Sequence, residues 1–367
     1  MKSKKKIIVN FTIFGLILSS CSTASVKLSN EAPAKAHQMQ GHEIDKYLSY
    51  QHFDIASVEE LNQIIVNQSS SREQNTKLQK LKRNVKKITS KKSFTLNINN
   101  SNIHSLALLK LIYKFDLPIS IAWDELDAEQ AFNHLASERL SGFCNSIFED
   151  TLEAIAGKIS NAAEETIVIY VDKYSAFNTT LSEQFPELIS IELNKNNPLE
   201  FASTILGIDE SNDRFKKITN LNPNQKLKFI PRSRKDTKNI VLLLEPDQYK
   251  SVLPAFRYHG GNKFEYINFS SAIESLGNLL QLLDFEKTQM SLSSYLLNEI
   301  KNKNRTSLDG ILGESALNDW LIVQVLKQAG VDSALVNGMS GKIIYKRDSC
   351  AKRIIPLISI NSQWVTS

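Results

Sequence analysis

Along most of the chain, short runs of β-branched and aromatic residues alternate with longer stretches whose apolar positions recur every three or four residues. The short runs predict strands at Phe94–Ile98, Leu117–Trp123, Thr166–Val171, Leu188–Leu193, Asn239–Leu244 and Phe264–Phe269. The longer stretches predict helices at 103–115, 143–164, 174–184, 198–219, 246–258, 270–283 and 313–329. Because strands that alternate with helices form parallel sheets covered on both faces, the pattern predicts an α/β fold.

Two further patterns concern the strands themselves. Residues Ile240 to Leu244 are apolar at every position, which is typical of a strand buried on both faces of a sheet. Near the C-terminal end, Lys342–Lys346 and Arg353–Ile360 are β-rich and flank a polar, charged turn. These two segments predict a closing hairpin.

Residues 46–92 form a short basic region that is predicted to be helical. One face of this region is apolar at Leu78, Leu81, Val85 and Ile88. Four cations nearby are candidates for contact with a partner: Lys80, Arg83, Lys86 and Lys87. They either dock on an acidic partner or anionic lipid, or form the solvated outer face of a packed helix, and the pattern favours the solvated face.

The first residues resemble a bacterial lipoprotein signal. A lysine-rich start precedes an apolar run from Ile7 to Leu18, which is too short to cross a bilayer as a permanent helix. The run ends in Leu18-Ser19-Ser20-Cys21, which resembles a lipobox, so residues 1–20 are predicted to be a signal peptide and Cys21 the lipid attachment site. The alternative is an ordinary secretory signal with a chance cysteine.

The residues after Cys21 predict where the anchor lies. Ser22 stands where an aspartate usually retains a lipoprotein at the inner membrane, so we expect an outer-membrane anchor facing the periplasm. Residues 21–45 are polar and lack periodicity, which predicts a flexible tether. The folded α/β body is expected over residues 93–367.

The charge of the chain excludes one class of partner. The chain has 44 basic and 39 acidic residues, a formal net charge of +5 and a pI near 8.8. Lys2, Lys4, Lys5 and Lys6 leave with the predicted signal, so 40 basic residues remain against 39 acidic ones. A nearly neutral mature chain gives no reason to expect a nucleic-acid partner.

Cys144 and Cys350 are the two cysteines that the lipid does not use. In an oxidising compartment they either pair across about 200 residues or remain separate thiols. Because spacing in the sequence shows nothing about proximity, the sequence favours two separate thiols.

The sequence offers no credible catalytic or metal-binding set. Ser349-Cys350-Ala351-Lys352 matches the S-x-x-K tetrad of penicillin-recognising serine enzymes, but it lies in the turn of the predicted hairpin and lacks the partner motifs. The six histidines have no metal-ligand spacing, and no P-loop or dinucleotide glycine pattern is present. We therefore predict no cofactor, no metal and no enzyme activity.

The segment from Leu206 to Tyr258 carries an ordered string of motif residues. It contains L-x-I-D-x-S-x-x-R, then L-x-F-x-P-R-x-R-x-D before the apolar run, and then a P-x-Q helix entry. The matching positions are Leu206, Ile208, Asp209, Ser211, Arg214, Leu227, Phe229, Pro231, Arg232, Arg234, Asp236, Pro246 and Gln248. This string resembles the C-terminal domain of the LppC/LpoA family of outer-membrane lipoproteins, which activate penicillin-binding proteins. More loosely, Gly338-Met339-Ser340-Gly341 is similar to the family's G-x-T-G before its last hairpin, and Arg353 matches an arginine of that hairpin.

The resemblance implies a bilobed fold like that of type I periplasmic-binding proteins, with parallel sheets. It also implies a non-catalytic protein that binds and stimulates a class A penicillin-binding protein in peptidoglycan synthesis. The alternative is a periplasmic lipoprotein of the same fold that binds a small ligand. The family's long array of helical repeats is absent and its first apolar strand is not recognisable, so the N-terminal lobe is expected to be incomplete.

Six motif residues are charged or polar candidates for a site: Asp209, Ser211, Arg214, Arg232, Arg234 and Asp236. The two arginines of the second motif either bind a carboxylate or phosphate ligand in forked geometry, or form internal salt bridges with Asp209 or Asp236. Internal salt bridges are the favoured interpretation, because such clusters are common structural elements.

Overall fold

The computed structural model describes residues 63, 72–91, 93–98, 108, 111–113, 119–123, 135–193, 197–221, 228–260, 263–276, 279–301 and 310–361. Several predicted features lie outside the described residues: the signal at 1–20, the lipid site Cys21, the tether at 21–45 and nearly all of 46–71.

The main element is a six-stranded sheet with the strand order β11-β7-β6-β5-β3-β4. Its strands are β3 (Thr166–Tyr170), β4 (Ile189–Glu192), β5 (Asn239–Leu243), β6 (Glu265–Asn268), β7 (Gln289–Ser291) and β11 (Leu357–Ser359). All neighbours pair in parallel except β11, which runs antiparallel to β7. Every residue of β5 is buried, as its unbroken apolar sequence predicts. The predicted α/β fold with a mostly parallel sheet is confirmed.

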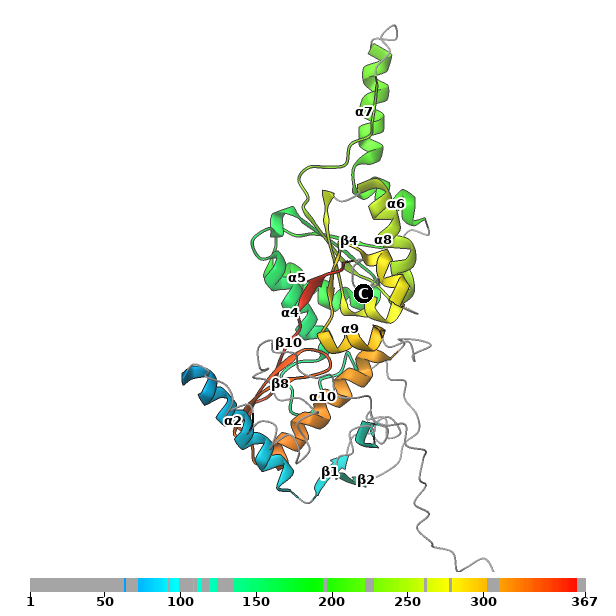
Figure 1. The fold of residues 1–367 in the computed structure, drawn as a ribbon. Helices are drawn as coiled ribbons and strands as arrows, with labels where there is room; N and C mark the ends of the chain where they lie inside the picture. Colours follow the sequence, from blue (N-terminus) through cyan, green and yellow to red (C-terminus); the bar gives the residue numbers. More distant parts are fainter. Residues whose placement is uncertain are drawn as a thin grey trace, which may run out of the picture. The chain divides into compact units, whose positions relative to one another are not determined.

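Helices flank this sheet, as the alternating pattern predicts. They are α4 (Ile147–Ile159), α5 (Ser175–Gln184), α6 (Pro198–Ile205) and α8 (Pro246–Gly260), with 3-10 helices η3 (Ala163–Glu165), η4 (Asp172–Tyr174), η6 (Ser270–Ser275) and η7 (Leu279–Phe285). Figure 1 shows α4 and α5 on one side of the sheet and α6 and α8 on the other. Because the chain moves outward from β3 to β4 and then back past β3 to β5, right-handed crossovers place the helices on both faces.

Two predicted helices differ in the structure. The stretch 198–219 is divided at Gly207, whose φ of +70° ends α6 and lets the chain start α7 (Ile208–Leu221) in a new direction. The stretch 270–283 forms η6 and η7, which are 3-10 helices, instead of one α-helix. Figure 1 shows α7 pointing away from the six-stranded sheet.

The predicted closing hairpin is only half correct. Strands β9 (Lys342–Lys346) and β10 (Lys352–Ile354) pair antiparallel, and β8 (Ser333–Asn337), which the sequence analysis missed, completes a three-stranded sheet with them. The rest of the predicted second strand becomes β11 in the other sheet. Pro356 lies between β10 and β11, and because proline has no backbone N–H to donate, the ladder cannot continue through it.

The N-terminal part of the described chain packs onto a long helix, α10 (Ile311–Gln328). This N-terminal part comprises α2 (Arg72–Thr89) and a parallel pair of strands, β1 (Phe94–Ile98) and β2 (Ile119–Trp123). The predicted apolar face of α2 is buried, and its Asn84 side chain donates to the backbone oxygen of Ser333 in β8 at 3.0 Å. Gln328 at the end of α10 bonds both backbone groups of Thr95 in β1. A short helix, α9 (Ser294–Lys301), follows β7.

Candidate functional site

The first motif over residues 206–214 forms the turn between α6 and α7. Asp209 accepts a hydrogen bond from Ser203 Oγ at 2.5 Å and one from Thr204 Oγ1 at 2.9 Å. These bonds tie the first turn of α7 to the last turn of α6. The carboxylate of Asp209 also lies at the N-terminus of α7, the positive end of that helix's dipole. Asp209 thus holds two helices at their junction.

The second motif returns along α7 toward the sheet. The backbone N–H of Arg232 donates to Ser211 Oγ at 3.1 Å, and that of Arg234 donates to the Leu206 oxygen at 2.8 Å. The two motifs, 20 or more residues apart in the sequence, therefore meet at the base of α7. Together they fix the angle at which this helix leaves the body.

The salt bridge that the sequence analysis favoured is present between Arg234 and Asp236. The guanidinium contacts both carboxylate oxygens at 2.7 Å. These hydrogen bonds raise the pKa of Arg234 and lower the pKa of Asp236. Arg214 lies farther from the body on α7, where it forms an exposed ion pair with Glu210 at 3.8 Å. Arg232 is exposed and forms no ion pair with any described residue. The motif residues are thus mainly structural.

The cations of α2 divide into two groups. Lys87 donates to the Gly330 oxygen at 2.9 Å and to Asp332 Oδ2 at 3.1 Å, so it ties α2 to the end of α10. Lys80, Arg83 and Lys86 are exposed, and none of them pairs with a carboxylate within the described parts of the chain. These three side chains, here called the α2 basic face, remain available to an acidic partner.

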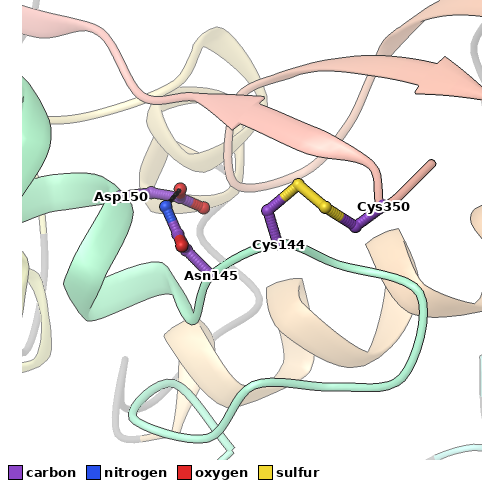
Figure 2. The surroundings of a disulfide bond; sticks show 4 residues. All are labelled: Cys144, Asn145, Asp150 and Cys350. Carbon is purple, nitrogen blue, oxygen red and sulfur yellow. Dashed lines mark hydrogen bonds between the residues drawn. A yellow bond between two sulfur atoms is a disulfide. The ribbon is translucent and has the colours of Figure 1, made fainter.

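Cys144 and Cys350 form a disulfide, so the favoured expectation of two separate thiols is wrong (Figure 2). The bond joins the segment before α4 to the turn between β9 and β10, 206 residues later. Backbone hydrogen bonds run alongside it: Cys144 donates to Ala351 at 3.0 Å, and Ala351 donates to Gly142 at 2.7 Å. The two distant segments therefore meet through backbone pairing as well as through sulfur.

Next to the disulfide lies a buried charge cluster that the sequence analysis missed. Arg353 Nη1 donates to Asp150 Oδ2 at 2.7 Å, its Nε lies 3.6 Å from Asp319 Oδ2, and its guanidinium lies 4.3 Å from the centre of the Phe143 ring. Asn145 holds the other oxygen of Asp150 at 3.0 Å (Figure 2). Burial raises the pKa of both carboxyl groups, and the charge of Arg353 opposes that rise.

Asp319 also explains the glycine-rich turn that resembles the family's. Its carboxylate accepts the backbone N–H groups of Met339 at 2.6 Å and Ser340 at 3.2 Å, and the Ser340 hydroxyl as well. A Cβ at Gly338 would lie only 2.5 Å from Asp319 Oδ1, so this position needs glycine. This buried cluster ties α4, α10 and β10 together.

A solvent-open hollow of about 500 Å³ lies at the amino ends of β5 and β6. Lysines from four segments line it: Lys158, Lys238, Lys263 and Lys287. Lys158 pairs with Glu265 at 2.9 Å and Lys238 pairs with Glu165. Lys263 and Lys287 have no carboxylate partner among the described side chains, so the hollow is locally basic.

The part of the chain that the structure describes contains no group of three potential metal ligands. Ser349 and Lys352 lie at the β9–β10 turn and its following strand, not on a helix where one turn would bring them together.

Two comparisons with known proteins add nothing to this picture. No family model matches the chain, and no curated protein is detectably similar to it. Among the described helices, none is long and apolar enough to cross a membrane.

Proposed function

We propose that this chain is a lipid-anchored, non-catalytic regulator that docks on a class A penicillin-binding protein and stimulates peptidoglycan synthesis from the outer membrane. The observation that carries the proposal is the ordered motif string over residues 206–258, which resembles the LppC/LpoA family. In this protein the motif residues stabilise the base of an exposed helix, as suits a protein that acts by contact. The disulfide suits an oxidising compartment outside the cytoplasm.

The same resemblance carries the finer proposal for the fold, a bilobed body like that of type I periplasmic-binding proteins. The mostly parallel six-stranded sheet with helices on both faces supports one complete lobe. The two-stranded parallel sheet β1–β2 supports a reduced second lobe, in line with the missing first strand of the family.

Stimulation would be allosteric. A regulator that binds the active conformation of a synthase more tightly than the inactive one shifts the equilibrium toward the active form. The α2 basic face offers Lys80, Arg83 and Lys86 for such binding, because these cations are exposed and no carboxylate of the described residues competes with a partner's acidic residues.

The direct test uses the full, lipid-modified chain in detergent. We expect a tagged chain to recover a class A penicillin-binding protein from solubilised envelope, and the purified chain to raise the glycan-polymerisation rate of that synthase. A pull-down without any synthase, together with an unchanged rate, would overturn the proposed function.

The docking face is tested separately by charge reversal. Replacing Lys80, Arg83 and Lys86 with glutamate should weaken synthase binding roughly tenfold or more. The matched control replaces three exposed lysines elsewhere, Lys250, Lys346 and Lys352, with glutamate, which changes the net charge equally. Equal losses in both variants would show that net charge, not the α2 basic face, governs binding.

A second candidate, binding of a small anionic ligand, is supported by the lysine-lined hollow at the amino ends of β5 and β6. Inorganic pyrophosphate should raise the thermal unfolding temperature if the lysines hold an anion. The double change Lys263→Gln and Lys287→Gln should abolish that shift, whereas Lys250→Gln with Lys346→Gln should preserve it. No shift at matched ionic strength would remove pyrophosphate-like ligands from consideration.

A further inference from the structure

The helix α7 and the returning segment 228–233, here called the arm, leave the body of the protein (Figure 1). Ile208 and Ser211 are the buried residues of α7, and both lie at its base. From residue 212 to 221 no side chain of the helix is buried. The arm is therefore exposed to its surroundings over most of its length.

The two halves of the arm are held together by aromatic stacking. The ring of Phe215 on α7 lies flat against that of Phe229 on the returning segment, with centroids 4.1 Å apart and planes 9° apart. Such stacking, with the bond from Arg232 N–H to Ser211 Oγ below it, makes the arm a defined structure that can present side chains.

On both sides of this stack, the arm exposes large aliphatic side chains: Ile218 and Leu221 lie farther out on α7, and Ile230 lies just inside the stack on the returning segment. Leu221 is 85% exposed, Ile230 is 81% exposed and Ile218 is 53% exposed. Single exposed aliphatic residues are common on protein surfaces. Three on one thin projection expose apolar surface to water at a cost in free energy, unless a membrane or another protein covers them.

The charges of the arm are separated along its length. Asp209, Glu210 and Asp213 lie in the half of α7 nearest the body. Lys216, Lys217 and Lys228 lie around the exposed aliphatic residues, and all three are exposed. Lys216 pairs with Asp213 at 3.2 Å. Lys217 and Lys228 still give the outer half a net positive charge among its described residues. An occupant of this surface must therefore be apolar and anionic at once.

The size of the arm favours a membrane surface over a protein as the partner that covers it. A stable protein–protein interface buries about 800 Å² on each partner and involves about 20 to 30 residues a side. The described residues of the arm present only three exposed large aliphatic side chains, Ile218, Leu221 and Ile230, which is a small apolar set for the centre of such an interface. A bilayer surface demands no such area, because each aliphatic side chain can enter the headgroup region separately while lysines contact anionic headgroups.

We propose that the arm inserts Ile218, Leu221 and Ile230 into the surface of a membrane that contains anionic lipid, with the surrounding lysines on the headgroups. This contact would attach the body to the bilayer at a second place, in addition to the predicted lipid on Cys21. It requires neither the synthase nor the α2 basic face, so it stands independently of the proposed function.

The test places a reporter on the arm of the full chain. In the variant Leu221→Trp, vesicles of phosphatidylethanolamine and phosphatidylglycerol should shift the added emission to the blue, and brominated acyl chains should quench it. Leu280→Trp is the matched control, since Leu280 is 66% exposed and lies in η7, outside the arm. Quenching of the arm reporter should exceed that of the control by about twofold or more.

Two further measurements make the proposal falsifiable. Adding Lys216→Gln, Lys217→Gln and Lys228→Gln to the Leu221→Trp chain should lower its quenching in the anionic vesicles to the level seen in phosphatidylcholine vesicles. Equal quenching of the Leu221 and Leu280 reporters would overturn the proposal. A blue shift that appears without vesicles and depends on protein concentration would show that the arm contacts a second copy of the chain. A blue shift that requires lipid-free envelope protein would show that the arm contacts a protein partner. Either outcome would overturn membrane insertion.

Discussion

Two arginine–aspartate pairs in this protein have the same contact distance in opposite surroundings. Arg353 contacts Asp150 at 2.7 Å, and Arg234 contacts Asp236 at 2.7 Å. The side chain of Arg353 is only 2% exposed, whereas that of Asp236 is 65% exposed. Water screens the second pair and cannot reach the first. Distance alone therefore says little about what an ion pair contributes, and burial decides it.

The largest effect is expected from breaking the buried pair. Arg353→Met keeps much of the side-chain volume but leaves the carboxylates of Asp150 and Asp319 without their cation. We expect a loss of about 3–5 kcal/mol in the free energy of unfolding, because uncompensated charges remain buried. Urea unfolding followed by tryptophan fluorescence measures it. A loss below about 1 kcal/mol would make the two ion pairs equivalent and break the comparison.

The disulfide should have the next largest effect. Replacing Cys144 and Cys350 together with serine removes a link that closes 206 residues, and a loss of about 2–4 kcal/mol is expected. Urea unfolding of wild type with and without reductant gives the same comparison without mutation. If the serine variant and the reduced wild type are as stable as the oxidised protein, the backbone pairing beside the bond is sufficient by itself.

The pH dependence of stability should have opposite signs for Asp319, the second carboxyl group beside Arg353, and for Asp236. Burial raises the pKa of Asp319, so the folded state holds a proton that the unfolded state loses above pH 3.8, and stability falls as pH rises through that window. Relative to Asp319→Asn, the wild type should lose up to about 1.4 kcal/mol per pH unit there. The lowered pKa of Asp236 gives stability above pH 3.8 that is lost as pH falls. Unfolding curves of the wild type and Asp319→Asn from pH 4 upward measure the first effect, and those of the wild type and Asp236→Asn below pH 4 measure the second. Parallel curves in both comparisons would contradict the prediction.

The smallest effect is expected at the exposed pair. Arg234→Gln should cost less than about 1 kcal/mol, because water replaces the lost contacts with Asp236. The same urea series used for Arg353→Met gives the value. A loss as large as that of the buried variant would show that the base of the arm supports the body more strongly than its exposure suggests.

Much of the fold follows from the sequence because most strands have a local signal. The unbroken apolar run of β5 and the spacing of apolar residues in α2 are examples. The short strands β7 and β8 are not predicted, and two further errors arise where one residue overrides such a pattern. Gly207 divides a helix, and Pro356 divides a strand between two sheets. Neither effect appears in the average hydrophobicity of its segment, although both residue types are known to interrupt regular structure.

The buried cluster was much less accessible to sequence reasoning. Arg353 was noted as a hairpin residue, but Asp150 lies about 200 residues away, and no local pattern connects them. One signal was present: Asp319 is a charged residue inside the predominantly apolar helical stretch 313–329. A carboxylate in such a place must find a partner or carry a proton, and that rule alone would have marked it. The motif residues at the arm, in contrast, were found together because they are close in the chain.

The division of residues 352–359 between two sheets also constrains the order of events during biosynthesis. Both β10 and β11, together with Cys350 and Arg353, emerge from the ribosome after the strands and helices that they join. The six-stranded sheet lacks its β11 edge, and Asp150 and Asp319 lack their cation, until the last of these residues arrives. Native packing of the body must therefore be completed after translation has passed residue 359. A chain interrupted before residue 350 would leave two buried aspartates and an open sheet edge, which are features that favour degradation or aggregation over a partly active product.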